Sequence, residues 1–164
     1  MKKIYIREKT LIQDSFKLAV MIFNSQFRPD FLIGIWRGGS TVGIYVQECL
    51  QFLGVQTDHI SIRTSYQGEP DYRERVAKGH KIRAHGLQYL LENLNYNQKL
   101  LIVDDVYGSG SSINAVINQL SERLKKNMPS DYKVAVPWYK PSQNKSGRIP
   151  LKVTSIDAFS SVIL

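Results

Sequence analysis

The chain has 164 residues, of which 43% are hydrophobic and 22% charged, enough apolar residues for the core of one compact domain. This composition excludes a wholly disordered chain and a collagen-like repeat, and the one cysteine, Cys49, excludes a disulfide-stapled miniprotein. No apolar run approaches the roughly 20 residues of a membrane helix, and the charged first residues do not fit a signal peptide. We therefore expect a soluble protein in the reducing cytoplasm, with no membrane partner.

The chain is basic, with a formal net charge of +8. A surface of this sign favours anionic partners, and nucleic acid, phosphorylated metabolites and acidic membranes all satisfy that condition. A solvated basic surface without any specific ligand explains the charge equally well. The charge alone therefore does not identify a partner.

Hydrophobic residues recur at helical and strand spacings in alternation along the chain. Thr10 and Gln13 have the form of a capping box and predict the start of a helix that ends before Pro29. A strand over 31–36, a glycine turn and a helix ending before Gly54 follow. The later predicted elements are a strand over 59–63, a helix over 87–94, a buried strand over 99–103, a helix over 113–124 and strands over 134–138 and 153–156.

Strands that alternate with helices predict an α/β fold, a single domain over 1–164 with a mostly parallel sheet flanked by helices. In such sheets, ligands bind at the carboxyl ends of strands. Two of the predicted strand ends carry unusual chemistry, at residues 37–39 and 104–112. Residues 64–84 have weak periodicity and predict a long loop, with strand edges or disorder as alternatives.

The segment 104–112 combines two kinds of ligand-binding group. Asp104 and Asp105 end a buried strand and can accept hydrogen bonds from sugar hydroxyls or hold Mg²⁺ through water. The backbone N–H groups of 108–112 can converge on a phosphate at the start of the next helix, with serine hydroxyls as further donors. Either half alone fits an ordinary glycine-rich turn or a solvated strand end. Their order along the chain favours a ligand site, and the pattern is neither a Walker loop nor a dinucleotide fingerprint.

Residues 103–112 resemble the phosphoribosyl-diphosphate motif of the type I phosphoribosyltransferases, closest to the purine enzymes. Tyr107 stands where an aliphatic residue is usual, and Gly108 stands where the hypoxanthine-guanine enzymes carry an aspartate that handles the purine N7 proton. The resemblance implies that Asp104 and Asp105 are catalytic and hold Mg²⁺ through water. It implies the following phosphoribosyl-diphosphate ligands: Arg37, Gly38, Gly39, Asp104, Asp105, Gly108, Ser109, Gly110, Ser111 and Ser112.

Two further segments resemble parts of the same family. Residues 37–39 resemble its diphosphate loop, in which glycines admit an anion to the backbone and Arg37 complements the phosphoryl oxygens. Residues 64–84 fall where the family has its lid. The lid cations that can meet the diphosphate, or simply be solvated, are Arg73, Arg75, Lys78, Lys81 and Arg83. We expect His80 and His85 on the surface rather than in acid-base roles.

The resemblance assigns the base site to a small C-terminal hood over 132–164. Lys140 is the candidate donor to the exocyclic oxygen of a 6-oxopurine, which adenine lacks. Phe159 is the candidate for stacking on the base, with core packing as an equal alternative. The tail lacks the aromatic-rich end of the bacterial xanthine-guanine enzymes, which leaves the choice of base open.

The implied activity is transfer of ribose 5-phosphate from phosphoribosyl diphosphate to hypoxanthine, guanine or xanthine, with release of diphosphate, in purine salvage. The implied assembly is a homodimer or homotetramer, and nucleic acid is not an expected partner of such an enzyme. The rival interpretation is a phosphoribosyl-diphosphate-sensing regulator that binds RNA or DNA without catalysis. The basic charge and the missing side chain at Gly108 keep that rival open.

Overall fold

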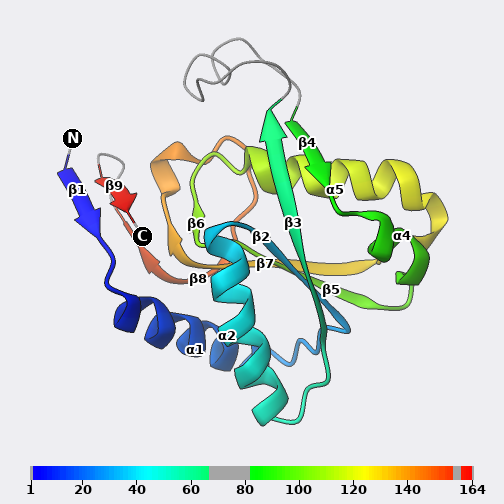
Figure 1. Cartoon of the computed structure of the whole chain (residues 1–164), viewed down its shortest axis with the longest axis horizontal. Coiled ribbons are helices and arrows are strands. Elements are labelled where there is room, and N and C mark those ends of the chain that lie inside the picture. Colours follow the sequence, from blue (N-terminus) through cyan, green and yellow to red (C-terminus); the bar gives the residue numbers. More distant parts are fainter. Residues whose placement is uncertain (1, 67–81, 157–159, 164) are drawn as a thin grey trace.

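The computed structural model describes residues 2–66, 82–156 and 160–163 (Figure 1). The strands are β1 (Lys2–Tyr5), β2 (Phe31–Trp36), β3 (Asp58–Tyr66), β4 (Ile82–His85), β5 (Lys99–Val103), β6 (Val106–Tyr107), β7 (Asp131–Tyr139), β8 (Leu151–Ser155) and β9 (Ser160–Ile163). The helices are α1 (Glu8–Asn24), α2 (Gly38–Phe52), α4 (Gln88–Asn93) and α5 (Ser111–Leu124), with 3-10 turns η1 (Lys125–Asn127) and η2 (Pro141–Gln143). Among these helices, none is long and apolar enough to cross a membrane.

A seven-stranded sheet forms the centre of the fold. Its strands follow the order β4-β3-β2-β5-β7-β6, and β8 pairs with the other edge of β7. Every pair in it is parallel except β3 with β4. The predicted α/β fold with a mostly parallel sheet flanked by helices is therefore confirmed.

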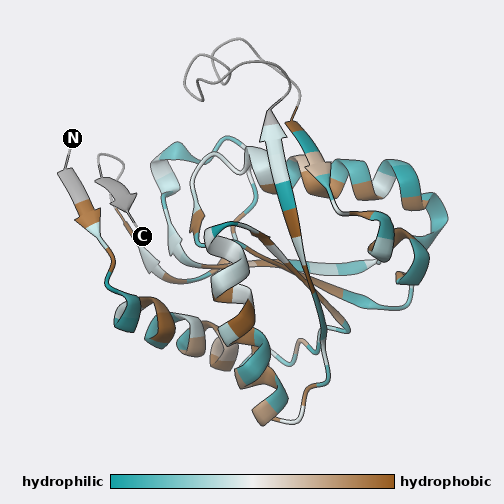
Figure 2. Ribbon diagram, in the orientation of Figure 1, coloured by the Kyte–Doolittle hydropathy of each residue, from teal (hydrophilic) through white to brown (hydrophobic). Residues whose placement is uncertain are grey.

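The core lies on both faces of this sheet, because successive apolar side chains of a strand point to opposite faces. On one face, Leu32, Leu101 and Val103 pack with α1 and α2. On the other face, Ile33 and Ile102 pack with α4 and α5. Figure 2 shows the apolar centre and the hydrophilic outer sides of the helices. Both faces of β2 and β5 are covered, which explains their unbroken apolar sequences.

Asp104 and Asp105 lie between two short strands, β5 and β6, which pair with the same edge of β7. Val103 pairs with Ala135 and Val106 with Trp138, so β5 and β6 keep one register along β7. Asp104 and Asp105 lie between the two strands, and the register continues through them by weak backbone bonds of 3.3 Å to β7. The sequence did not predict β6, because two residues are too few to show a period.

The first and last described segments form a second sheet. β1 and β9 pair in parallel, with Lys2 opposite Ser160 and Tyr5 opposite Ile163. Figure 1 shows this pair beside the end of the sheet that carries β8. Neither strand was predicted, because a pairing between the two ends of a chain has no local signal.

Three expectations about element boundaries change. The capping box was wrong: α1 begins at Glu8 with Arg7 as its N-cap, and the Thr10 amide already donates to the Arg7 carbonyl, at 2.9 Å. Gly38 and Gly39 belong to the first turn of α2 instead of a separate loop. Residues 64–66 and 82–84 are strand, so the strand-edge alternative holds at both ends of 64–84.

Cys49 is half-buried at the border of the core, where burial raises the pKa of its thiol.

His85 is exposed, as expected, and hydrogen-bonds Ser65 across β3 and β4 at 2.8 Å. The predicted positions of Arg73, Arg75, Lys78, His80 and Lys81 lie outside the described residues.

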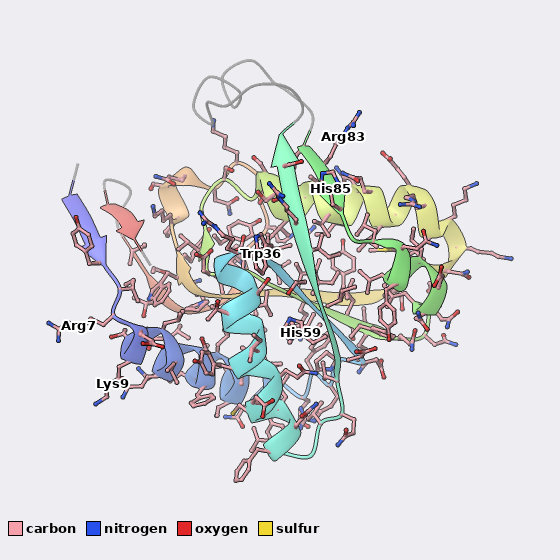
Figure 3. All side chains as sticks on the ribbon, in the orientation of Figure 1. Arg7, Lys9, Trp36, His59, Arg83 and His85 are labelled. Carbon is pink, nitrogen blue, oxygen red and sulfur yellow. The ribbon has the colours of Figure 1, made fainter. Side chains whose placement is uncertain are left out.

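Two glycines make room for a histidine between α2 and the sheet. The imidazole of His59 is so close that a Cβ placed on Gly43 would lie 2.8 Å from its Nε2 atom, and one on Gly34 would lie 3.0 Å from it. This Nε2 atom is buried without a hydrogen-bond partner in the described part of the chain, and burial lowers the pKa of the ring. Figure 3 shows His59 beside α2. A neutral ring therefore sets the spacing between α2 and the sheet.

We expect Gly43→Ala to destabilise the protein by about 1–3 kcal/mol, because the new methyl group overpacks against His59. In a His59→Ala background the same change should cost much less, because the nearest remaining atom, Leu32 Cδ2, is 3.1 Å away and helical alanine is favoured over glycine by about 1 kcal/mol. Urea unfolding of the two single variants and the double variant measures this difference. Equal effects of Gly43→Ala in both backgrounds would contradict it.

Candidate functional site

The two unusual strand ends predicted from the sequence meet at neighbouring strands. β2 leads into α2, and β5 leads into Asp104 beside it. A Cβ on Gly39 would lie 2.7 Å from both the Asp104 Cα atom and the Val103 carbonyl oxygen. Those are backbone atoms that cannot move aside, so this approach requires glycine at position 39. The start of α2 is thereby held directly against the acidic pair.

Arg37 follows a cis peptide bond from Trp36, at the point where β2 passes into α2. Both side chains are exposed, and Figure 3 shows Trp36 at the start of α2. They border a cavity of about 620 Å³ that also contains both aspartates. The residues that line it are Leu11, Ile35, Trp36, Arg37, Gly38, Thr41, Thr64, Asp104, Asp105 and Ser112.

Asp104 and Asp105 each accept a hydrogen bond from the backbone amide that follows them. The Asp105 amide lies 2.9 Å from Asp104 Oδ1, and the Val106 amide lies 2.8 Å from Asp105 Oδ1. Neither carboxylate forms an ion pair within the described ranges. Burial, and next the charge of Asp105, raise the pKa of Asp104 well above its usual range. Ionisation of both carboxyl groups is therefore unfavourable unless a ligand supplies a cation or hydroxyl donors.

The bend between β6 and α5 presents amides toward a second cavity, of about 530 Å³. Gly110 has a φ of +80°, which favours glycine and turns the chain into α5. One amide of the bend is partly satisfied, since that of Ser111 lies 3.2 Å from the Ser109 hydroxyl. The amides of Gly108, Ser109 and Ser112 donate to no protein group among the described residues. These donors at a helix N-terminus suit a phosphate.

Lys140 reaches the same cavity from the end of β7. Its amide donates to the Tyr107 carbonyl at 2.9 Å, which holds β7 beside the bend. The residue is half-buried, and burial lowers the pKa of its ammonium group. The residues that line this cavity are Asp104, Val106, Tyr107, Gly108, Ser109, Gly110, Ser111, Ser112, Ile113, Lys140, Ser142, Gln143 and Lys145. Asp104 and Ser112 border both cavities, which therefore adjoin one another.

Gln143 lies against the position where the side chain of residue 108 is missing. A Cβ on Gly108 would be 3.1 Å from the Gln143 Oε1 atom. The side-chain amide of Gln143 thus lies where a larger side chain at position 108 would project. Sequence reasoning did not identify Ser142, Gln143 or Lys145, because 141–150 has no period and no motif.

The structure brings together most of the predicted site residues. Arg37, Gly38, Asp104, Asp105 and the bend border the two adjoining cavities, Gly39 packs behind them, and Lys140 joins them. Arg83 is exposed on β4 and borders neither cavity. Phe159 lies outside the described residues.

The acidic pair fits Mg²⁺ held with its waters. Among the residues described, no group of three or more His, Cys, Asp or Glu side chains is placed to hold a metal. Two carboxylates without an internal cation match an ion that keeps several waters and completes its shell with substrate oxygens. Asp104 and Asp105 are the residues that would hold it.

Comparison with known proteins identifies the family. Residues 4–162 match the phosphoribosyl transferase domain model. The chain belongs to the phosphoribosyltransferase family. Family membership makes it a transferase enzyme that uses phosphoribosyl diphosphate, as residues 103–112 predicted. A search of curated proteins gives no match.

Solved structures share the phosphoribosyltransferase fold. A purine phosphoribosyltransferase from Pyrococcus horikoshii Ot3 is 22% identical, with 99% of this chain and 92% of that chain covered and a TM-score of 0.68. A hypothetical protein from Neisseria gonorrhoeae with bound ppGpp is 19% identical, with 98% and 88% covered and a TM-score of 0.72. A mutant hypoxanthine phosphoribosyltransferase from Trypanosoma cruzi, complexed with the product IMP, is 17% identical, with 92% and 76% covered and a TM-score of 0.69.

We expect Asp104→Asn to be more stable than the wild type at pH 7. Because the pKa of Asp104 is raised in the folded protein, its ionisation above the unfolded carboxyl pKa of about 4 lowers the free energy of unfolding. Asparagine does not ionise, so the gain should shrink as the pH falls toward about 4. Urea unfolding at both pH values, without Mg²⁺ or ligand, measures it.

Asp131→Asn is the matched control, because Asp131 is an exposed carboxylate 3.8 Å from Lys99. It should show no such gain at pH 7. A loss of stability in Asp104→Asn at pH 7 would contradict the burial of an uncompensated charge.

Proposed function

We propose that this phosphoribosyltransferase transfers ribose 5-phosphate to a 6-oxopurine, namely hypoxanthine, guanine or xanthine, and acts in purine salvage. The observation that carries the proposal is the pair of adjoining cavities, which share Asp104 and Ser112. One offers bare amides and Lys140, and the other offers Arg37 beside the acidic pair. Phosphoribosyl diphosphate carries a phosphate at one end of its sugar and a diphosphate at the other, so each cavity would receive one of these groups.

The amide-lined bend holds the 5′-phosphate, and the acidic pair orients the ribose. The unpaired amides of Gly108, Ser109 and Ser112 donate to the phosphate oxygens at the start of α5. Asp104 and Asp105 accept hydrogen bonds from the ring hydroxyls. As the anomeric carbon loses diphosphate, positive charge develops on the ribose, and the nearby carboxylates stabilise it.

Arg37 and the first amides of α2 receive the diphosphate. The C1′–O bond breaks with its electron pair on the leaving diphosphate, a purine nitrogen forms the new bond to C1′, and the base loses one proton. When bound by Asp104 and Asp105, Mg²⁺ supplies positive charge that neutralises the diphosphate oxygens. The fixed placement of these groups replaces reorganisation of solvent in the reaction.

The base occupies the Lys140 end of the cavity of about 530 Å³, under a hood that we assign to residues 132–164 of a single domain over 1–164. The half-buried Lys140 ammonium donates to the exocyclic oxygen and disfavours adenine, whose amino group cannot accept that bond. We assign stacking on the base to Phe159, which lies outside the described residues. Neither Gly108 nor the Gln143 amide beside it can take up the N7 proton, so that proton passes to another group, to water or to diphosphate.

The same site can bind phosphoribosyl diphosphate in a regulator that also binds RNA or DNA. The net charge of +8 and the side-chain gap at Gly108 are the observations that favour this second candidate. We prefer the enzyme to the regulator because Lys140 borders the cavity of about 530 Å³, where we assign it a use only if a base is bound. We assign the enzyme to the cytoplasm, as a homodimer or homotetramer without a nucleic-acid partner.

We expect calorimetry with phosphoribosyl diphosphate and Mg²⁺ to show binding, and radiolabelled hypoxanthine, guanine or xanthine to yield nucleotide. Asp104→Asn and Asp105→Asn should each reduce turnover on the order of 10²-fold, because the groups that stabilise the developing charge are lost. Removal of Mg²⁺ with EDTA should abolish turnover. Absence of nucleotide from all three bases, with a steep salt-dependent affinity for RNA or DNA, would instead establish the regulator.

We expect Lys140→Ala to weaken base binding while the affinity for phosphoribosyl diphosphate stays nearly unchanged. Loss of one charged hydrogen bond predicts roughly a tenfold or greater rise in KM for the base. Steady-state kinetics in each substrate separately measures the two effects, with Lys126→Ala on the exposed η1 turn as control. An equal loss for both substrates would place Lys140 elsewhere in the mechanism.

A further inference from the structure

The segment that follows Lys140 folds back onto the amide-lined bend. The Lys145 amide donates to the Ser109 carbonyl at 3.3 Å. A Cβ on Gly110 would lie 2.9 Å from the Ser146 side chain and 2.5 Å from the Tyr107 hydroxyl. The bend and residues 145–146 are therefore packed together without space for a side chain between them.

A cluster of hydrogen bonds holds this arrangement. The Ser146 hydroxyl donates to Asn144 Oδ1 at 2.7 Å, so the Tyr107 hydroxyl, 2.7 Å from Ser146, is the donor to it. The Asn144 Nδ2 group donates to the Tyr139 hydroxyl at 2.9 Å and to the Arg148 carbonyl at 2.7 Å. Tyr107 and Tyr139 are both buried, and their rings pack edge to face. The cluster thus anchors an exposed segment to the core.

Lys145 is the residue that this cluster presents to the site. It borders the cavity of about 530 Å³ together with Ser109, Ser111 and Ser112. Its ammonium group pairs with no carboxylate in the parts of the chain that the structure describes. A cation fixed by its own backbone beside unpaired amides complements a doubly charged phosphate.

We propose that Lys145 binds the phosphate of the substrate and product, and that Tyr107, Asn144 and Ser146 position it at the bend. This inference rests on the proposed function, since it assigns a new ligand to the same sugar-phosphate site. It also gives Tyr107 a role that an aliphatic residue cannot fill, because an aliphatic side chain has no hydroxyl group to donate to Ser146 Oγ, which also accepts from the Arg148 amide at 3.1 Å. Lys145 is a binding residue, and the other three are positioning residues.

The test compares a nucleotide with its nucleoside. Calorimetry with IMP and with inosine isolates the phosphate, because the two probes differ only in that group. We expect Lys145→Gln to weaken IMP binding about tenfold, as for one partly exposed charged hydrogen bond, and to leave inosine binding unchanged. Lys126→Gln, an exposed lysine on η1, should change neither.

Tyr107→Phe tests the positioning cluster, since it removes only the hydroxyl group. We expect the variant to lose about as much IMP affinity as Lys145→Gln, and to add nothing further in a Lys145→Gln background. Circular dichroism establishes that the variant is folded. Unchanged IMP affinity in Tyr107→Phe would overturn the positioning role.

Two outcomes separate this inference from the proposed function. If the wild type binds IMP and Lys145→Gln binds it equally well, or loses IMP and inosine affinity alike, the role of Lys145 is overturned and the proposed function stands. If the wild type binds none of IMP, GMP and phosphoribosyl diphosphate, the sugar-phosphate site itself is refuted, and the role of Lys145 with it.

Discussion

The approach of Gly39 to the backbone of Asp104 is the contact on which the site depends. A Cβ at position 39 would lie 2.7 Å from the Asp104 Cα atom, so only glycine lets α2 begin directly beside the acidic pair. Because β2 and β5 are neighbours in the sheet, this contact joins the start of α2, where Arg37 lies, to Asp104 and Asp105 between β5 and β6. Arg37 and the carboxylates thus border one cavity, as a leaving diphosphate and a ribose require.

The charged groups of the site lack ion pairs within the described residues, and several of its backbone donors lack acceptors there. The acidic pair has no cation, three amides of the bend have no acceptor and Lys145 has no carboxylate, in the portion of the chain that is described. In the free protein each of these groups is either hydrated or buried without a partner, and such burial lowers the free energy of unfolding. The sugar phosphate and Mg²⁺ of our proposal would supply a partner to each of them. The raised pKa of Asp104 agrees with this arrangement, because burial and the neighbouring Asp105 charge outweigh its one backbone hydrogen bond.

The segment after Lys140 adds to this site a part that the family resemblance did not supply. Tyr107 and Gly108 differ from the residues usual in the family motif, and both lie against side chains of residues 141–150. The Tyr107 hydroxyl bonds Ser146, and the Gln143 amide lies against the bare face of Gly108. Both unusual motif residues thus lie against the segment 141–150. The bend of this protein is consequently supported from both β6 and the end of β7.

The sequence by itself determined the alternating strands and helices, the acidic pair and the glycine bend, because periodicity and turn chemistry are local properties of the chain. The lysine after β7 was implied by the family resemblance. It did not determine β1 with β9, or β6, because pairings between distant or very short segments have no local period. The capping box failed for a related reason, since the Arg7 backbone already provides the first turn of α1. Only the tertiary structure decided that Ser142, Gln143 and Lys145 border the cavity of about 530 Å³. The segment that carries them folds back through long-range hydrogen bonds from Lys145 to Ser109 and between Ser146 and Tyr107, which no spacing encodes.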